Sequence, residues 1–333
     1  MIGVAVIGLG RVGRLHASTL ASQVPGARLV MVVDKLADLA ASVGGELGAS
    51  WATDADEALA HRDVAGVVIA APTPLHAELI ERAAAANVHV FCEKPLAVQP
   101  DRAQRAVDAA RSAGVRLQVG FQRRFDPDFI AAKHHIDSGR VGRVQLLRIA
   151  HRNRTPPHDD GLTERLGSIF VDMTVHDFDT ARWLVGEVEE ISAFEHKRNT
   201  ITVLRFRNGG LGVIDNSRYA GYGFECSAEA VGSDATLRIG GGARPVNVDV
   251  LEDCASLSRV AEDHIERHLP AYREELRHFV ACVRDGSEPC VGGEDAVAAL
   301  ELAIAAERCV APSPLAPPRR WRPPAVRRGS RTP

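Results

Sequence analysis

The chain has 333 residues, of which 45% are hydrophobic and 25% are charged. This composition is typical of a globular protein and excludes a collagen-like, coiled-coil or largely disordered chain. The formal net charge is −3, and residues 311–333 contribute six arginines and no acid. The rest of the chain is therefore clearly acidic and would repel phosphate backbones, so we expect no nucleic-acid partner except through this tail.

Several sequence features bear on membranes and location. The longest apolar run, Val64 to Ala71, has eight residues, far short of the roughly 18 to 20 that span a bilayer. Met1 to Leu9 has the pattern of a buried strand and not that of a signal peptide. The six cysteines form no C-x-x-C pair, which favours reduced thiols. We expect a cytoplasmic protein without a membrane partner, ending in a disordered proline-rich and arginine-rich tail at 311–333.

Strands and helices alternate through the first 120 residues. Short apolar runs predict strands at Ile2–Ile7, Leu29–Val33, Ala65–Ala71, Val88–Cys92 and Val115–Val119, separated by alanine-rich helices such as Leu75–Ala86 and Pro100–Ala113. Nearly all-apolar strands in strict alternation with helices predict an α/β fold, a doubly wound parallel sheet covered on both faces. A ligand is expected beyond the carboxyl ends of its strands.

A G-x-G-x-x-G pattern follows the first predicted strand directly. Gly8 permits a tight turn, Gly10 lets a pyrophosphate approach the backbone, and Gly13 lets the next helix pack on the strand. Asp34 ends the second strand, where a carboxylate can bond the adenosine ribose hydroxyls and repel a 2′-phosphate. The pattern predicts NAD as cofactor in preference to NADP, although Lys35 weakens that discrimination.

Polar residues also follow the third and fourth predicted strands. Thr73 and His76 come after the third, where they either close over the nucleotide or serve only as turn and helix-cap residues. Glu93 and Lys94 come after the fourth. An ammonium at the mouth of the cofactor crevice suits hydride transfer, which needs a cation beside the reacting oxygen. The alternative for Lys94 is a surface ion pair with Glu93.

The pattern changes after Val144 to a succession of strands with short turns. These are predicted at Val144–Ala150, Ile191–Phe194, Ile201–Phe206, Leu211–Asn216, Phe224–Val231 and Thr236–Ile239, and helices return at Ala271–Arg284 and Glu294–Cys309. We expect an α+β domain with a large, mostly antiparallel sheet. One face of such a sheet is often buried against another subunit, so we expect a homo-oligomer, a tetramer or a dimer.

The segments define a domain plan. Residues 1–120 form a nucleotide-binding domain, residues 121–310 form a substrate-binding and oligomerisation domain whose last helices pack back on the first domain, and residues 311–333 form the tail.

A predicted helix at Ser168–Val185 carries Asp172, His176 and Asp179 at spacings i, i+4 and i+7. These spacings place the three side chains on one stripe, where a carboxylate can lie beside an imidazole. Such a stripe suits a general base, His176, with orienting acids. A surface ion pair or a buried polar network would explain the same residues, and a metal site with His158 lacks a closed ligand set, so we expect no metal.

Together these motifs resemble the glucose-fructose oxidoreductase and inositol dehydrogenase (GFO/IDH/MocA) family over the chain up to about Val310. The segments that carry the resemblance are GLGRVG at 8–13, PTPLH at 72–76, EKP at 93–95, GFQRRFD at 120–126 and DMTVH at 172–176. The resemblance implies a Rossmann-type domain followed by an α+β domain, and it places the chain nearest to inositol 2-dehydrogenases.

The resemblance also implies roles for individual residues. Lys94, Asp172 and His176 would be catalytic, with His176 as base. The cofactor would bind Gly8, Gly10, Arg11, Val12, Gly13, Asp34, Lys35, Thr73, His76, Glu93, Lys94 and Gln122. The substrate would bind Arg124, His151, Asn153, Asp179, Tyr222 and Tyr272. One departure is Phe224, because the family's Tyr-Gly-Tyr segment is Tyr222-Gly223-Phe224 here.

The resulting hypothesis is an NAD-dependent dehydrogenase that oxidises a secondary hydroxyl of a cyclic polyol, first of all myo-inositol to 2-keto-myo-inositol (scyllo-inosose). One alternative is a dehydrogenase of another cyclitol or a sugar, suggested by Phe224. A second is a non-catalytic NAD-binding regulatory protein of the same fold, which would have no need of Lys94, Asp172 and His176 together.

Overall fold

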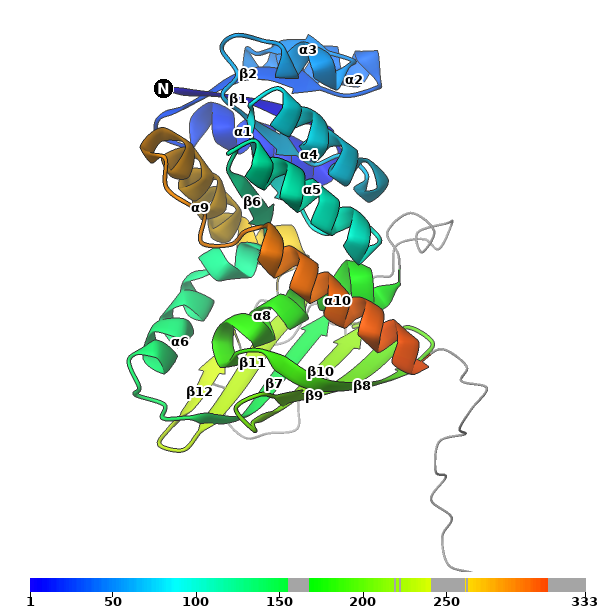
Figure 1. Ribbon diagram of the computed structural model, residues 1–333, viewed down its shortest axis with the longest axis vertical. Coiled ribbons are helices and arrows are strands. Elements are labelled where there is room, and N and C mark those ends of the chain that lie inside the picture. Colours follow the sequence, from blue (N-terminus) through cyan, green and yellow to red (C-terminus); the bar gives the residue numbers. More distant parts are fainter. Residues whose placement is uncertain (155–167, 219, 222, 241–260, 262, 311–333) are drawn as a thin grey trace, which may run out of the picture.

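The computed structural model describes residues 1–154, 168–218, 220–221, 223–240, 261 and 263–310. Along these residues the chain forms two six-stranded sheets, which Figure 1 shows one above the other. Residues 155–167, 219, 222, 241–260, 262 and 311–333 lie outside the described part, and the predicted tail falls among them.

The first sheet is parallel throughout. Its strands are β1 (Ile2–Ile7), β2 (Ala27–Val33), β3 (Ser50–Ala52), β4 (Gly66–Ile69), β5 (His89–Glu93) and β6 (Leu117–Gly120), in the order β3-β2-β1-β4-β5-β6. The chain leaves β1 toward one edge and returns to the other side of it at β4, which makes a crevice beyond the carboxyl ends of these two strands. The predicted doubly wound fold is confirmed.

Helices cover this sheet. They are α1 (Arg11–Ser22), α2 (Ala37–Leu47), α3 (Ala55–Leu59), α4 (His76–Ala85) and α5 (Pro100–Ser112), with a short 3₁₀ helix, η1 (Thr73–Leu75), before α4. The strands are buried from both sides, and Val4, Ala5 and Val6 of β1 are wholly inaccessible. A strand covered on both faces cannot show polar alternation, which is why these strands are nearly all-apolar in the sequence.

The second sheet is mixed. Its strands are β7 (Val144–Arg152), β8 (Val188–His196), β9 (Asn199–Phe206), β10 (Leu211–Ser217), β11 (Glu225–Gly232) and β12 (Thr236–Ile239), in the order β12-β11-β7-β10-β9-β8. Neighbours are antiparallel except β7 and β10, which pair in parallel. The mostly antiparallel sheet expected from the sequence is therefore confirmed, and β7 and β10 pair in parallel because the chain between them passes through other elements instead of a hairpin.

The remaining helices link the two sheets. They are η2 (Gln122–Phe125), α6 (Pro127–Asp137), the π-helix η3 (Phe170–Thr174), α8 (Val175–Val185), α9 (His264–Asp285) and α10 (Gly293–Val310). Figure 1 shows α10 running between the two sheets, and it contacts α5 and β6 as well as α8 and β8. The helix α9 packs on α1, β1 and β5. The end of the chain thus closes back on the nucleotide-binding sheet.

One face of the second sheet exposes several large apolar side chains. Side chains of β9 alternate strictly between buried and exposed, and the exposed positions include Ile201 at 51% and Val203 at 39%. Phe194 of β8 and Leu211 of β10 are 65% and 45% exposed. The described helices that contact this sheet do so at the opposite face (Figure 1).

The structure also bears on membrane contact and on cysteines. Among the described helices, none combines the length and the apolarity needed to cross a bilayer. Five of the cysteines lie in the described residues, and all five are free thiols.

Candidate active site

The glycine pattern forms the turn between β1 and α1. Gly8 has φ of +93°, which side-chain-bearing residues rarely adopt. A Cβ atom at Gly13 would lie 1.9 Å from the carbonyl oxygen of Gly8, so only glycine fits there. At Gly10 a Cβ atom would meet nothing within 4 Å. The backbone at Gly10 is thus open to a ligand, and the amides at the start of α1 suit an anionic one such as a pyrophosphate.

Asp34 lies beside this turn. Its carboxylate accepts hydrogen bonds from the backbone N–H of Leu9 at 2.8 Å and of Leu36 at 3.0 Å. Two bonds orient the carboxylate, and each oxygen keeps a lone pair for a ligand hydroxyl. The neighbouring Lys35 is exposed. Arg11 forms an ion pair with Asp263, which caps the start of α9, while Val12 is half-buried.

The loops after β4 and β5 are joined by His76. Its Nδ1 lies 2.8 Å from the carbonyl oxygen of Pro95 and its Nε2 lies 2.7 Å from that of Ala71. Both ring nitrogens therefore contact protein carbonyl groups, and the side chain is only 2% exposed. Thr73, which starts η1, is also buried. His76 therefore connects the loop after β4 with the loop after β5.

Lys94, directly after β5, reaches across to the second half of the chain. Its ammonium donates to the backbone carbonyl of Asp172 at 2.7 Å, and it lies 3.6 Å from the Asp172 carboxylate. The other oxygen of that carboxylate accepts from Arg218 at 2.7 Å. Lys94 and Asp172 are 17% and 22% exposed at the side chain. The Asp172 carboxylate is therefore held between two cations.

The predicted helix at 168–185 exists, but its first part is the π-helix η3. A π-helix bonds residue i to i+5 and shifts the side chains relative to an α-helical stripe. Asp172 consequently contacts Lys94 and Arg218, and Asp179 forms a bidentate pair with Arg124 at 2.9 and 2.6 Å. The sequence suggested that a carboxylate of this stripe would contact the imidazole of His176. In the structure, Asp172 and Asp179 instead contact cations.

His176 lies in the first turn of α8, just after this π-helix, and is largely buried. The side chain is 9% exposed, and within the described part of the chain its Nδ1 has no hydrogen-bond partner. Its ring packs edge-on against Phe121 at 5.9 Å and His151 at 6.4 Å. Burial, reinforced by the charges of Lys94 and Arg123, lowers the pKa of His176 well below its ordinary value. The imidazole is therefore neutral at physiological pH and able to accept a proton.

Beside His176, the imidazole of His151, on β7, does contact a carboxylate. Its Nδ1 lies 3.2 Å from Asp177 and 2.9 Å from Arg123. Asp177 is fully buried, and it also pairs with Arg123 and accepts from Asn216 at 2.7 Å. These contacts outweigh burial and lower the pKa of Asp177 to about 2. This network fixes the ring of His151 beside His176.

The other predicted residues lie as follows. Arg124 is occupied by Asp179 and by Asp295 at 2.9 Å. Asn153 follows β7 with its side-chain amide 3.9 Å from the sulfur of Met173. Gln122 is buried at the start of η2, and Tyr272 packs edge-on against His16 at 5.9 Å. Tyr222 and His158 fall outside the described residues.

Several residues of the site were not identified from the sequence. Arg218, Arg123 and Asp177 each complete an ion pair in it. His264 lies at the start of α9. Burial, and then the charges of Arg11 and Lys94, lower the pKa of its imidazole to about 4. Phe224 lies among the rings of His151, His264 and His268. Arg123 and Asp177 each adjoin a predicted residue, which is the one signal that could have found them.

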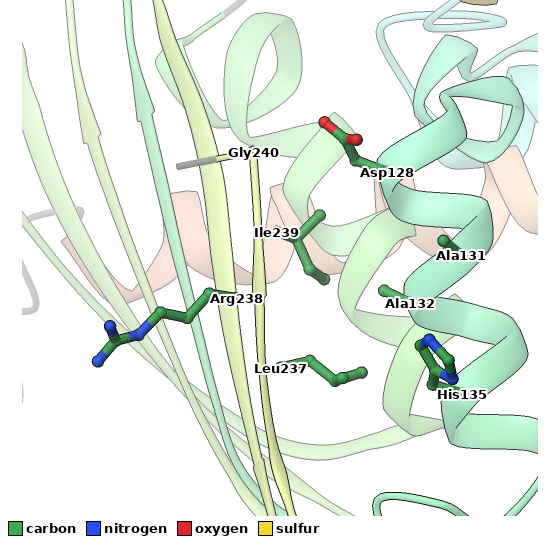
Figure 2. A pocket seen from close by; sticks show the side chains of 8 residues that line it. All are labelled: Asp128, Ala131, Ala132, His135, Leu237, Arg238, Ile239 and Gly240. Atoms are coloured by element: carbon green, nitrogen blue, oxygen red, sulfur yellow. The ribbon is translucent and has the colours of Figure 1, made fainter. Parts of the chain in front are cut away.

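A separate hollow lies between α6 and the edge strand β12. Figure 2 shows Leu237 and Ile239 pointing toward the helix and Arg238 pointing away from it. The lining residues are Asp128, Ala131, Ala132, His135, Leu237, Arg238, Ile239 and Gly240. None of the predicted site residues is among them, so this hollow is distinct from the site around Lys94.

The buried ion pair of Asp177 predicts a pH-dependent stability. In Asp177→Asn, Arg123 is left without its charged partner, and we expect a loss of about 3 kcal/mol or more in the free energy of unfolding at pH 7. Because the folded-state pKa is lowered, the stabilising contribution is present above the unfolded value near 3.8 and is lost as the pH falls toward 2. Urea unfolding of both proteins between pH 7 and 3 measures this difference.

The matched control is Asp101→Asn, which removes an exposed ion pair with Arg105. It should change stability by no more than about 0.5 kcal/mol. An Asp177→Asn variant as stable as this control would show that the network has no energetic importance.

Comparison with known families identifies both halves of the chain. A family model described as the oxidoreductase family with an NAD-binding Rossmann fold matches residues 2–121. A second model, described as the GFO/IDH/MocA C-terminal domain, matches residues 129–238.

Individual relatives are similar over nearly the whole chain. The scyllo-inositol 2-dehydrogenase (NAD(+)) of Bacillus subtilis is 36% identical over 316 residues, covering 91% of this chain and 92% of that protein. The myo-inositol 2-dehydrogenase of Thermotoga maritima is 36% identical over 320 residues, covering 92% and 95%. The crystal structure of a myo-inositol dehydrogenase from Corynebacterium glutamicum has a TM-score of 0.84 at 31% identity, covering 93% of this chain and 96% of the other. The chain therefore belongs to the GFO/IDH/MocA family of oxidoreductases with an NAD-binding Rossmann domain.

Proposed function

We propose that this protein is an NAD-dependent dehydrogenase that oxidises a secondary hydroxyl of a cyclic polyol, first of all myo-inositol to 2-keto-myo-inositol. The observation that carries the proposal is the convergence of Lys94, Asp172 and His176, from opposite halves of the chain, near the crevice of the nucleotide-binding sheet. The names of the relatives, which are inositol dehydrogenases of similar length, support the substrate class.

NAD, held at this site, would supply the acceptor for the hydride that leaves the oxidised carbon. The open backbone at Gly10 and the oriented carboxylate of Asp34 fit the pyrophosphate and the adenosine ribose of NAD. A 2′-phosphate would meet the negative charge of Asp34, which supports NAD over NADP. Arg11, Val12, Lys35 and Gln122 complete the proposed cofactor site, with Thr73, His76 and Glu93 in the loops that border it.

Each catalytic side chain has a distinct role in this proposal. His176, neutral because of burial, accepts the hydroxyl proton. The ammonium of Lys94 stabilises the negative charge of the alkoxide that develops as the proton leaves. Asp172 holds Lys94 through its backbone carbonyl, and its carboxylate balances the charge of Lys94 and Arg218. Positioning and polarisation are thus the chain's own contribution.

The substrate would lie between His176 and the strands of the second sheet. His151, oriented by Asp177, and Asn153 are the proposed hydroxyl partners on β7 and just after it. Tyr222 and Tyr272 remain proposed contacts, as do Arg124 and Asp179. Because Arg124 and Asp179 are paired with each other, a substrate would meet them as a combined donor and acceptor.

Two alternatives are distinguishable. The relatives named for scyllo-inositol and for myo-inositol are equally similar, at 36% identity, so scyllo-inositol or another cyclitol is the second candidate substrate. A non-catalytic NAD-binding regulator is the other. The intact contacts between Lys94 and Asp172 next to His176 favour an enzyme, because a regulator does not need them.

We also infer that the protein is a cytoplasmic homo-oligomer that associates through the open face of its second sheet. Free thiols support a reducing compartment. The exposed side chains of Phe194, Ile201, Val203 and Leu211 form an apolar patch on adjacent strands. A solvated sheet face normally carries polar side chains, and an apolar one marks an interface. A dimer through this face, or a tetramer built from such dimers, would cover it.

The direct test is absorbance of the reduced nicotinamide with NAD or NADP against myo-inositol, scyllo-inositol, other inositol isomers and hexoses. We expect turnover of an inositol with NAD and little with NADP. Turnover of scyllo-inositol alone would select the second candidate. Silence across the panel, with NAD still binding in a thermal-shift assay, would favour the regulator.

His176→Ala should lower kcat by about two to four orders of magnitude, the usual contribution of a positioned general base, and leave NAD binding intact. The control is His134→Ala on the exposed side of α6. Since the pKa of His176 is lowered, the base stays neutral below pH 6.5, and the acid limb of kcat/KM should lie below that value. Near-normal turnover in the variant would remove His176 from the mechanism.

The interface is tested by light scattering after gel filtration. The 35.8 kDa chain should elute as an oligomer, and Ile201→Lys with Val203→Lys should dissociate it because two buried charges would be unpaired. The control is Ile130→Lys on α6, whose side chain is 45% exposed. A monomeric wild type, or a doubly substituted protein that still associates, would contradict this surface.

A further inference from the structure

A group of polar atoms lies buried where α1, β5, β6 and α9 meet. Nδ1 of His16, Oε1 of Gln118 and both carboxyl oxygens of Glu275 are buried without a hydrogen-bond partner among the described residues. His16, Gln118 and Glu275 have no exposed surface. Buried polar atoms are normally paired. Four unpaired atoms in one place therefore require an explanation.

The group is centred on two carboxyls and one imidazole. One ligating atom from each of His16, Glu93 and Glu275 lies within 4.8 Å of the other two. Nε2 of His16 is 2.8 Å from Glu93. Glu93 lies against Gly120, where a Cβ atom would be 2.9 Å from its Oε2. Glu93 is therefore held on two sides, while no described residue donates to the Glu275 carboxyl.

An ionised Glu275 is not compatible with this place. A buried carboxylate without a donor and beside a second carboxylate is strongly destabilised, and such a group keeps its proton instead. Burial, and then the charge of Glu93, raises the pKa of Glu275 well above its ordinary value. Burial opposes ionisation of Glu93 too, but the hydrogen bond of His16 lowers the pKa of Glu93. These opposite pKa shifts favour a neutral Glu275 beside an ionised Glu93.

We propose that Glu275 is a neutral acid that shares its proton with the Glu93 carboxylate, and that this buried bond positions Lys94 for catalysis. A protonated carboxyl becomes a donor, and the Glu93 carboxylate is an acceptor within the same group. Lys94 is the next residue after Glu93, and it reaches Asp172 from there. The role for Lys94 rests on the proposed function, whereas the proton on Glu275 does not.

The bond would also join the two halves of the chain. Glu275 is on α9, which follows the second sheet in sequence, and Glu93 ends a strand of the first sheet. The backbone carbonyl of Glu275 accepts from the side chain of Gln118 on β6 at 2.8 Å. One shared proton therefore adds a second connection between α9 and the strands beside the proposed cofactor site.

Other ionisable groups surround the pair. Those that act on Glu93 or Glu275 are His16 of α1, Lys94 after β5, His76 of α4 and, on α9 itself, Tyr272. Strand β1, which also packs on α9, has no ionisable side chain. In η2, Arg123 and Arg124 are bound to Asp177 and Asp179. Lys94 supports an ionised Glu93, and among these groups none donates to Glu275.

The proton can be counted by replacing the acid with an amide. Glu275→Gln replaces a neutral group with another neutral group, so the electrophoretic mobility of the folded protein at pH 7 should equal that of the wild type. The matched control is Glu274→Gln, the preceding residue, which is 40% exposed and paired with arginines. It removes one negative charge per chain and should shift the mobility by that amount. An equal shift in Glu275→Gln would overturn the proposal.

The wild-type protein offers a second measurement that needs no inactive or unstable variant. Infrared spectroscopy in D₂O at pH 7 should show the carbonyl band of an un-ionised carboxylic acid, and this band should be missing in Glu275→Gln. A difference spectrum without the band would overturn the proposal. Stoichiometric zinc or another divalent cation in the purified protein would do so as well, since a cation bound by His16, Glu93 and Glu275 would displace the proton.

Kinetics test the positioning role. Glu275→Gln can still donate to Glu93 and should keep kcat for inositol oxidation within about twofold, whereas Glu275→Leu, which cannot, should lose about fivefold or more in kcat, the equivalent of one hydrogen bond. Equal losses of kcat in both variants would overturn the proposed positioning of Lys94. If no polyol is oxidised at all, the mobility and infrared results still decide the proton, so this failure is distinguishable from a failure of the proposed function.

Discussion

The contact between Lys94 and Asp172 is the constraint on which the site depends. Lys94 projects from the end of a Rossmann strand, and Asp172 from a helix that precedes most of the second sheet. A cation at the carboxyl edge of a parallel sheet is free to point in many directions, and its long side chain loses entropy when it is held. The backbone carbonyl of Asp172, aided by its carboxylate, fixes that direction. This contact joins the two halves of the chain beside the crevice of the nucleotide-binding sheet.

Around this contact, charge is balanced group by group. Asp172 lies between Lys94 and Arg218, and Asp177 is paired with Arg123, so both acids have a cation in contact. His176 is different, because it is buried near cations and without a carboxylate in contact. That difference keeps its imidazole neutral, which is the protonation state that the proposed role as a base requires. The paired charges around the site and the unpaired imidazole of His176 both suit the proposed proton transfer.

The sequence predicted the elements of the site better than their pairing. Residues in loops at strand ends, such as Asp34 and Lys94, could be placed because the carboxyl ends of parallel strands share one edge. The helix with Asp172 and His176 could be located too. Its π-turn could not, because that turn depends on how the segment packs and not on local periodicity. Arg218 could not be found at all, since its partner is 46 positions away in sequence and nothing in its own neighbourhood marks it.

By itself the sequence determined the class of the fold, the glycine turn and its acidic partner, since these follow from local patterns: apolar strands alternating with helices, and glycines where no side chain fits. It also determined the residue types of the proposed chemistry. Only the tertiary structure decided which acid meets which base, because ion pairs form between side chains brought together by the packing of two sheets. The same holds for Glu275, an ordinary glutamate in sequence. Burial beside Glu93 raises the pKa of Glu275. Burial is a property of the folded chain and cannot be seen in the sequence around this residue.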